Sequence, residues 1–244
     1  MKTLILIPSR LAATRLPGKP LLKINGLSII SHVFKKAEEA NIGEVVVATE
    51  DQEIAEDVKK NGGQAILTNN NHKTGTDRIF EALKKLNKVD IDLVMNLQGD
   101  EPLMNVEDIK NLNTQMVNNK SKLGTLGSII KDQKLYKNQN VVKVITKETL
   151  DESKFSEAEG FFRETLSDNK NIYHHLGIYC YQIETLRTLI SLRQSKNEIK
   201  NRLEQLRALD NNIQINVALA KTSSIGVDTK EDFVAIKKIM EYKF

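Results

Sequence analysis

The sequence predicts an α/β protein built on a doubly wound, mostly parallel sheet. Short apolar runs bounded by turn residues alternate with amphipathic helical stretches over residues 1–120, as in right-handed strand–helix–strand units. Polar loops follow the apolar runs, at the sheet edge where open α/β folds bind their ligands. At 244 residues the chain is long enough for one sizeable domain.

Four buried strands are predicted in the first half of the chain, at residues 4–7, 44–49, 64–68 and 91–97. We expect the first strand to end at Pro8. Ser28 is placed to cap the helix that follows, and Gly62 with Gly63 ends a helix over residues 52–60. Two further helices have apolar residues at helical spacing: Ile79, Phe80, Leu83 and Leu86 in one, Val106, Ile109 and Leu112 in the other.

After Asn119 the pattern changes to a smaller mixed region. Strands without a helix between them are predicted at residues 123–131 and 141–146, and the polar residues 151–172 indicate a long loop. Further strands at residues 175–182 and 213–220 flank one helix marked by Ile199, Leu203, Leu206 and Leu209. Thr229 is expected to cap a final helix with Phe233, Ile236 and Met240 facing inward.

Composition excludes several functional classes. The net charge of +4 is the small difference between 36 basic and 32 acidic residues, and the lysines are scattered. With no Trp to stack on bases, nucleic-acid binding is not expected. No apolar run approaches a membrane span or a signal peptide, and Cys180 is alone, so it is most simply a core residue. The chain is therefore expected to be cytoplasmic.

The loop over residues 9–20 contains three fixed cations, Arg10, Arg15 and Lys19, among small residues and prolines. Small residues let backbone amides approach an anion closely, and the side chains add full positive charges. Its place after the first strand favours a polyphosphate site that includes Pro8 and Ser9. The alternative is a solvated basic surface loop.

Residues 74–78, Thr-Gly-Thr-Asp-Arg, open a predicted helix. Thr74 and Gly75 suit a hydroxylated or anionic ligand, and Arg78 offers a bidentate fork to a carboxylate. Simple helix capping would need only Thr76 or Asp77, and this alternative stays open.

Two acidic residues are candidates for binding a metal ion. Asp100 follows Gln98 and Gly99 directly after a strand, where Mg²⁺ takes one or two carboxylates and leaves its other positions to phosphate and water. Asp228 precedes the last helix and is equally suited to interact with the helix dipole. For Asp100 the alternative is an ordinary acidic turn.

His174 and His175 precede an apolar strand, and adjacent residues on a strand point to opposite faces. We therefore expect one of them to face a site and the other solvent. No spacing supports a zinc centre. By residue type alone, Glu204 and Gln205 would form a solvated helix face.

Six segments in register resemble the 3-deoxy-manno-octulosonate (Kdo) cytidylyltransferases: IPSRLAATRLPGKPL, TGTDR, NLQGDEP, HLGIY, LEQLRAL and GVDT. The resemblance spans nearly the whole chain. It implies the fold of nucleotide-diphospho-sugar transferases, a homodimer and a role in lipopolysaccharide biosynthesis. It also implies the reaction of CTP with Kdo to CMP-Kdo and pyrophosphate, with Mg²⁺ as cofactor.

The domain organisation expected from this resemblance is a single nucleotidyltransferase domain over residues 1–244. Within it, residues 1–120 would bind the nucleotide. Residues 121–221 would bind the sugar acid and form the dimer contact, and residues 222–244 would return to the nucleotide-binding region.

The resemblance also assigns roles to individual residues. Arg10, Lys19, Asp100 and Asp228 would be catalytic, and the last two would bind the metal. CTP would contact Pro8, Ser9, Arg10, Arg15, Lys19, Thr74, Gly75, Gly99 and Asp100. The sugar acid would contact Arg78, Gln98, His175, Tyr179, Glu204 and Gln205, which replaces the solvated-face interpretation of the last two.

One segment departs from the family pattern. Where the family has Phe-Ser-Arg leading into a proline-containing loop, this chain has Phe155-Ser156-Glu157, and its last proline is Pro102. A related substrate such as an 8-amino Kdo analogue therefore stays open. So does a module that binds CTP without turnover, although the presence of Asp100 and Asp228 argues against it.

Overall fold

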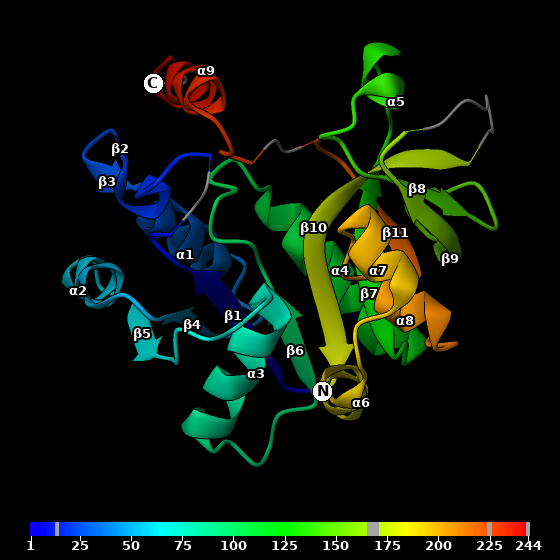
Figure 1. The fold of residues 1–244 in the computed structure, drawn as a ribbon, viewed down its shortest axis with the longest axis horizontal. Helices are drawn as coiled ribbons and strands as arrows, with labels where there is room; N and C mark the ends of the chain where they lie inside the picture. The colour runs from blue at the N-terminus through cyan, green and yellow to red at the C-terminus, as the bar shows by residue number, and fades with distance from the viewer. Residues whose placement is uncertain (13–14, 165–170, 224–225, 243–244) are drawn as a thin grey trace. The chain divides into compact units, whose positions relative to one another are not determined.

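The computed structural model describes residues 1–12, 15–164, 171–223 and 226–242 (Figure 1). The chain forms two compact units. The N-terminal unit comprises residues 2–91, 95–109 and the C-terminal residues 226–242. The central unit comprises residues 1, 92–94 and 110–223. The α/β fold class is confirmed.

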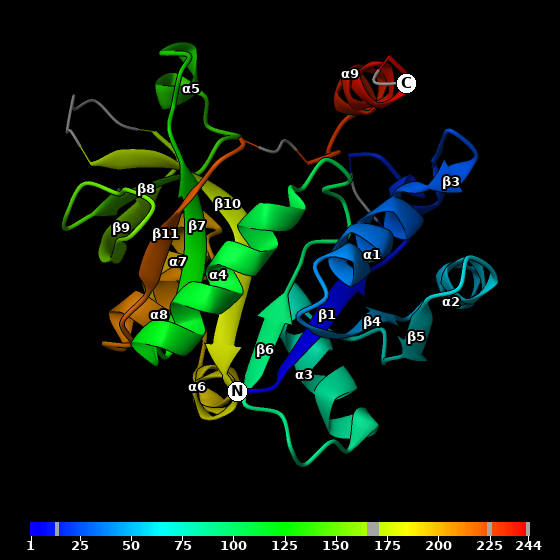
Figure 2. The ribbon, with the colours of Figure 1, turned by 180° about the vertical axis from the view of Figure 1, so that it is seen from behind.

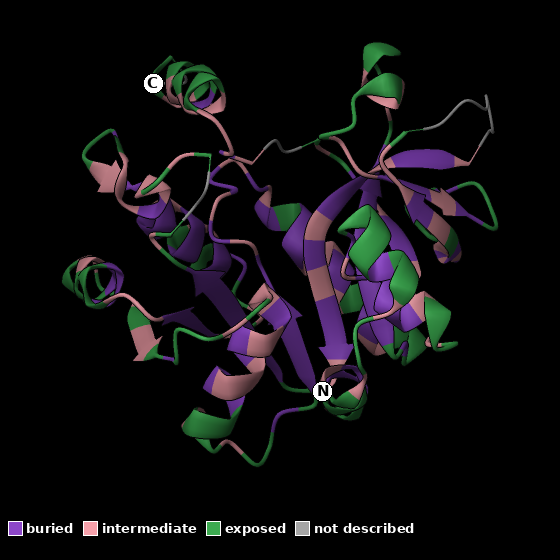
Figure 3. Ribbon diagram, in the orientation of Figure 1, coloured by how far each residue is buried: buried purple, intermediate pink, exposed green. Residues whose placement is uncertain are grey.

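The N-terminal unit contains the parallel sheet. Strands β1 (Thr3–Ser9), β4 (Gly43–Thr49), β5 (Gln64–Leu67) and β6 (Leu93–Asn96) have the order β5-β4-β1-β6, and β1–β4 and β4–β5 are parallel. Of β6, Met95 and Asn96 belong to this unit. β1 is buried along its whole length, as expected for a strand covered on both faces (Figure 3). All four strands lie within two residues of their predicted positions. β1 continues through Pro8, where it was expected to end, to Ser9.

Helices α1 (Ile29–Glu39), α2 (Gln52–Lys60), α3 (Gly75–Leu86) and α4 (Val106–Asn119) follow the strands as predicted. Ser28 caps α1 by accepting from the backbone N–H of Ser31, which confirms its predicted role. Thr74 and Asp77 form a capping box at α3, so the capping interpretation is correct for Asp77, whereas the cap residue itself is Thr74 and not Thr76.

A short hairpin in the N-terminal unit was not predicted. Strands β2 (Lys23–Ile24) and β3 (Leu27–Ser28) flank Asn25 and Gly26, which have φ of 48° and 81°. An Asn-Gly pair with both residues at positive φ is the preferred two-residue hairpin turn. The 3₁₀ turn η1 (Lys19–Leu21) precedes this hairpin.

The C-terminal helix α9 (Lys230–Glu241) packs against the β2–β3 hairpin and the start of α1 in the N-terminal unit. Ile236 joins Ile24, Ile29 and Val227 in one buried cluster. Thr229 caps α9 through a capping box with Asp232, as predicted. This packing fixes the segment that contains Asp228.

The central unit is a ring of strands: β7 (Leu123–Ser128), β8 (Lys143–Thr146), β9 (Phe155–Phe162), β10 (Ile172–Gln182) and β11 (Asn216–Ala220) (Figure 2). Their order is β10-β7-β11-β9-β8, and β8 also pairs with β10, which closes the ring. Only the β7–β11 pair is parallel among the pairings described within this unit. The predicted mixed character of this region is confirmed.

Two predictions for the central unit were wrong in detail, and one helix was not predicted. The expected loop over residues 151–172 contains β9, whose polar residues hid a partly buried strand held between β8 and β11; residues 165–170 lie outside the described chain. The predicted strand over 123–131 ends at Ser128, and a one-turn helix α5 (Lys134–Lys137) follows it. Helix α6 (Ile183–Ser191) was not predicted.

The helix expected around Ile199 to Leu209 was also wrong. It is two helices, α7 (Lys196–Asn201) and α8 (Leu206–Asp210). Arg202 ends α7 with a left-handed φ of 54°. The turn between the helices contains Glu204, and Gln205 stands directly before α8.

Candidate active site

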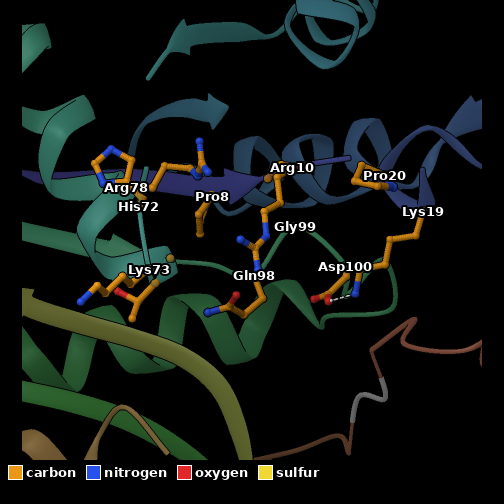
Figure 4. Close-up of a pocket in the computed structure, with 13 residues that line it drawn as sticks. Pro8, Arg10, Lys19, Pro20, His72, Lys73, Arg78, Gln98, Gly99 and Asp100 are labelled. Carbon is orange, nitrogen blue, oxygen red and sulfur yellow. Dashed lines mark hydrogen bonds and ion pairs between the residues drawn. The ribbon is translucent and has the colours of Figure 1, made fainter. Parts of the chain in front are cut away.

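A pocket of about 250 Å³ opens at the carboxyl ends of β1 and β6 in the N-terminal unit (Figure 4). The loop before α3 and the turn η1 complete its wall. Ten of the predicted site residues line it: Pro8, Ser9, Arg10, Lys19, Thr74, Gly75, Arg78, Gln98, Gly99 and Asp100. The structure therefore brings the first three predicted loops to one cavity.

Two glycines bring their backbones close to Pro8 at this pocket. A Cβ built on Gly99 would lie 2.9 Å from the carbonyl oxygen of Pro8, and one on Gly75 would lie 3.2 Å from its Cγ. Contacts below 3.0 Å to backbone atoms do not occur without displacement. A side chain at position 99 would therefore push the first loop away from the loop after β6.

Lys19 joins the two predicted metal carboxylates. Its Nζ donates to Asp100 Oδ2 at 2.5 Å and to Asp228 Oδ1 at 3.3 Å, and it also donates to the carbonyl oxygen of Val227 at 2.8 Å. Burial lowers the pKa of Lys19, but the charges and hydrogen bonds of Asp100 and then Asp228 outweigh it, so the pKa is raised. The ammonium group is therefore firmly charged.

The other two cations of the first loop differ in their surroundings. Arg15 forms an ion pair with Asp228 Oδ2 at 2.8 Å and is half exposed. Arg10 is exposed at the pocket wall (Figure 4). Beside it, Ser9 Oγ is buried and has no hydrogen-bond partner among the described residues. The pocket thus offers an exposed cation and an unused hydroxyl group.

Arg78 lies at the pocket wall but is held by protein partners. Its guanidinium forms an ion pair with Glu50, and NH1 donates to Thr68 Oγ1 at 2.7 Å. The side chain is 3% exposed. Only the face of the guanidinium that points away from these partners is available to a ligand.

Sequence reasoning missed His72 and Lys73, which also line the pocket. His72 Nε2 is hydrogen-bonded to Glu81, whose carboxylate also accepts from Lys85 and the backbone N–H of Asn69. Burial raises the pKa of Glu81, but these hydrogen bonds outweigh it and lower the pKa to about 2. In the sequence, the one indication that they belong to the pocket is that both residues directly precede Thr74.

The remaining predicted sugar-acid residues lie in the central unit. The His175 ring packs edge-on against Phe161, with centroids 5.0 Å apart, and lies 5.4 Å from the ring of Tyr179. Its Nε2 lies 3.0 Å from Thr125 Oγ1. Burial, followed by the charge of His174, lowers the pKa of His175 to about 3, so the ring is neutral at pH 7.

Tyr179, Glu204 and Gln205 line one small cavity with Leu123, Tyr181, Leu189 and Ala208. Its volume of about 10 Å³ is close to the minimum for a single water molecule, far below the size of a sugar acid. Burial raises the pKa of the Tyr179 hydroxyl, which stays protonated and can donate. The structure thus groups these three residues in a closed arrangement.

His174 and Cys180 take no part in these groups. His174 Nδ1 lies 2.8 Å from Ser223 Oγ, and burial lowers its pKa to about 4. Cys180 is a buried core residue, as predicted, with its thiol pKa raised by burial. Within the described ranges of the chain, no helix is long and apolar enough to cross a membrane.

Comparison with solved structures places the fold. The structure of CMP:2-keto-3-deoxy-manno-octonic acid synthetase complexed with CTP superposes with a TM-score of 0.90, at 33% identity and over 100% of both chains. A 4-diphosphocytidyl-2C-methyl-D-erythritol synthase from Anaerococcus prevotii shares the fold at 15% identity, with a TM-score of 0.63 over 98% of this chain and 99% of the other. The fold is that of a nucleotidyltransferase, with the pocket described above at the carboxyl ends of its strands.

Comparison with related sequences identifies the family of nucleotidyltransferases. The family model for cytidylyltransferases matches residues 4–215. The 3-deoxy-manno-octulosonate cytidylyltransferase of Nitrobacter winogradskyi is 42% identical over 241 residues, covering 98% of this chain and 94% of the relative. That of Thermodesulfovibrio yellowstonii is 40% identical, covering 98% of both. The chain belongs to the 3-deoxy-manno-octulosonate cytidylyltransferase family.

Proposed function

We propose that the protein transfers the cytidylyl group of CTP to Kdo, giving CMP-Kdo and pyrophosphate for lipopolysaccharide biosynthesis. The anomeric hydroxyl oxygen attacks the α-phosphorus in line with the bridging oxygen to the β-phosphorus. The new O–P bond forms as that bridge breaks, the pair of electrons leaves with pyrophosphate, and the proton of the hydroxyl group is released to water. The observation that carries this proposal is the cluster of Lys19, Asp100 and Asp228 at the phosphate pocket of a cytidylyltransferase.

The donor set of this cluster suits Mg²⁺. No group of three or more His, Cys, Asp or Glu side chains that could hold a metal occurs among the described residues. Two carboxylates that share Lys19 as a partner, Asp100 and Asp228, match a Mg²⁺ site completed by substrate phosphates and water. When bound there, one or two Mg²⁺ ions would neutralise phosphate charge and lower the pKa of the attacking hydroxyl.

The first loop would supply the remaining positive charge. Arg10 and Lys19 stabilise the negative charge that develops on the α-phosphate and on departing pyrophosphate. Ser9 Oγ, buried without a partner among described residues, is available to a phosphate oxygen. Thr74, Gly75 and Gly99 line the pocket where the rest of CTP would bind, and Arg15 contacts phosphate or supports the loop.

The residues proposed for the sugar acid form two groups, each within one unit. In the N-terminal unit, Arg78 would bind a carboxylate, with Gln98 beside it at the same pocket. In the central unit, the protonated Tyr179, neutral His175, Glu204 and Gln205 would bind hydroxyl groups. The cavity of about 10 Å³ must widen for this to happen. Buried side chains that discriminate hydroxyl patterns give strong specificity, because a wrong sugar leaves them unpaired.

A second candidate substrate is an 8-amino analogue of Kdo. Glu157 stands on β9 where the family pattern has arginine, and it is half-buried and 3.9 Å from Lys147. A carboxylate in place of a cation would suit an amine in place of a hydroxyl group. A panel of sugar acids in one assay separates the two substrates.

The assay is release of pyrophosphate. We expect release only when CTP, Mg²⁺ and Kdo are present together, and no release when UTP replaces CTP. Absence of release with every sugar acid in the panel would refute the transferase proposal, and binding of CTP without turnover would favour a silent nucleotide-binding module.

We further propose that the chain works as one transferase domain in a cytoplasmic homodimer. The support is the correspondence over the full chain with Kdo cytidylyltransferases and the use of CTP, a cytoplasmic nucleotide. Sedimentation equilibrium gives the mass of the assembly, and a monomer at micromolar concentration would refute the dimer.

A further inference from the structure

The ammonium group of Lys19 is surrounded by three oxygen acceptors. They are Asp100 Oδ2 at 2.5 Å, the Val227 carbonyl at 2.8 Å and Asp228 Oδ1 at 3.3 Å. The Lys19 side chain is 14% exposed, whereas those of Asp100 and Asp228 are 29% and 44% exposed. The lysine is therefore the most enclosed member of the cluster.

Two carboxylates and a carbonyl are also the ligands that a hard divalent cation prefers. A lysine ammonium is a compact point charge on a flexible stem, so it can occupy such a position and leave it again. As long as Lys19 Nζ stays there, a metal ion must compete with it for the same oxygens.

The backbone keeps the two carboxylates together independently of Lys19. The Val227 N–H donates to the carbonyl of Asp100 at 2.8 Å, and Val227 is fully buried in the cluster with Ile236. Arg15 holds the other oxygen of Asp228 at 2.8 Å. Moving Lys19 away would therefore leave both carboxylates in place, with only Asp228 still neutralised.

We propose that Lys19 is an internal counter-ion that occupies the metal-binding oxygens in the free protein. The triphosphate of the incoming nucleotide attracts the ammonium, which moves from the carboxylates to the phosphates and opens the position for Mg²⁺. Metal alone then binds weakly, and metal and nucleotide bind with positive coupling, which by thermodynamic linkage is the same in both directions. The nucleotide half of this inference rests on the proposed function.

The test measures metal binding to the nucleotide-free protein, with Mn²⁺ as the probe and electron paramagnetic resonance to count the free ion. We expect Lys19→Met to bind Mn²⁺ about tenfold more tightly than the wild type. Adding Asp100→Asn to that variant should abolish the gain, which assigns the ion to this cluster. Lys19→Gln serves as a second variant, and the thermal unfolding of each protein checks its fold.

Two matched controls distinguish occupation of the carboxylate oxygens by Lys19 from a general effect of positive charge on Mn²⁺ binding. Arg15→Met removes a positive charge 2.8 Å from Asp228 but leaves Lys19 in place, and it should tighten Mn²⁺ binding by less than threefold. Lys23→Met removes an exposed lysine nearby in sequence and should have no effect. Equal gains in Lys19→Met and Arg15→Met, or unchanged binding in both Lys19 variants, would overturn the proposal.

The proposed coupling between nucleotide binding and metal binding is tested by isothermal titration of CTP in EDTA and in Mg²⁺. The wild type should bind CTP at least fivefold more tightly with Mg²⁺, and this ratio should be smaller in Lys19→Met, where only the direct contact between metal and phosphate still couples the two ligands. A ratio that is the same in both proteins would overturn the coupling. If the protein binds no CTP at all, the proposed function fails, while the Mn²⁺ result still decides the role of Lys19.

Discussion

Arg78, at the wall of the candidate pocket, forms an ion pair with Glu50, with side chains 3% and 15% exposed. Thr68 accepts a second hydrogen bond from the same guanidinium. Arginine offers five N–H donors in a rigid fork, so these partners fix its orientation and leave donors for a ligand. Glu50 therefore determines where Arg78 presents its charge.

Arg78→Ala is expected to raise the KM for the sugar acid at least tenfold and to leave the KM for CTP within about twofold, because it removes a charged hydrogen bond to a carboxylate. It also leaves Glu50 unpaired, so Arg78→Ala with Glu50→Gln is measured alongside. An effect confined to the KM for CTP would contradict this role.

Asp100→Asn removes a carboxylate that we propose as a Mg²⁺ ligand while keeping the volume of the side chain. Its kcat should fall on the order of 10³-fold, because the proposed metal ion would neutralise charge at the α-phosphate. Asp90→Asn is the control, because Asp90 pairs with Lys2 on the surface and both are 61% exposed. Near-normal turnover in Asp100→Asn would remove this residue from the metal site.

Gly99→Ala introduces a Cβ that meets the Pro8 carbonyl at 2.9 Å. Because the first loop must move, the KM for CTP should rise about tenfold, as small misplacements of binding groups are costly. The matched change is Gly160→Ala on β9, where the Cβ meets only Ile145 at 3.6 Å and kinetics should not change. Equal kinetics for both variants would argue against close packing at the pocket.

His175 makes the stability of the protein depend on pH. Its pKa is about 3 in the folded protein against 6.5 for the ordinary group, so between these values the unfolded chain binds a proton that the folded one does not. The free energy of unfolding therefore falls as pH decreases from about 6.5 toward 3, by up to about 1.4 kcal/mol per pH unit. In urea unfolding, the free energy of unfolding of His175→Gln should fall less over this pH range. The same dependence on pH in both proteins would refute the role of His175.

Glu198 and Arg207 form a buried bidentate ion pair, with N–O distances of 2.9 and 2.6 Å and side chains 4% and 3% exposed. The pair joins α7 to α8 around the turn that contains Glu204. Glu198→Gln should destabilise the protein by roughly 3 kcal/mol by leaving Arg207 without its counter-charge. Since the turn would shift, the KM for the sugar acid should also rise more than that for CTP.

The surface pair Lys147–Glu157, with side chains 66% and 45% exposed, is the control for this prediction. Glu157→Gln should change the free energy of unfolding by less than about 1 kcal/mol. If Glu198→Gln changes the free energy of unfolding in urea titration as little as Glu157→Gln does, the buried ion pair does not stabilise the turn.

The N-terminal unit was predictable because its signals are local. Apolar runs identified the parallel strands, and Ser28 and Thr229 identified helix starts through hydrogen bonds to residues three positions away. The loops of the candidate site follow from those strands, since the carboxyl ends of parallel strands share one edge.

The central unit depends on contacts between distant segments. β9 looks polar in sequence, yet it is a strand because β8 and β11 pair with both of its edges. The break between α7 and α8 depends on the left-handed Arg202 and on the ion pair of Glu198 with Arg207. The Glu50–Arg78 pair likewise joins residues 28 positions apart, so no local pattern indicates it.

The closed ring of the central unit has a consequence for assembly. Because β8 pairs with both β9 and β10, each of the five described strands of this unit has a neighbour on either side. Free strand edges are where chains add to one another by backbone hydrogen bonding, as in sheet extension and fibril growth. Association through this unit must therefore depend on contacts between side-chain surfaces. Such contacts are specific to the residues present, and they do not extend from chain to chain as sheet edges do.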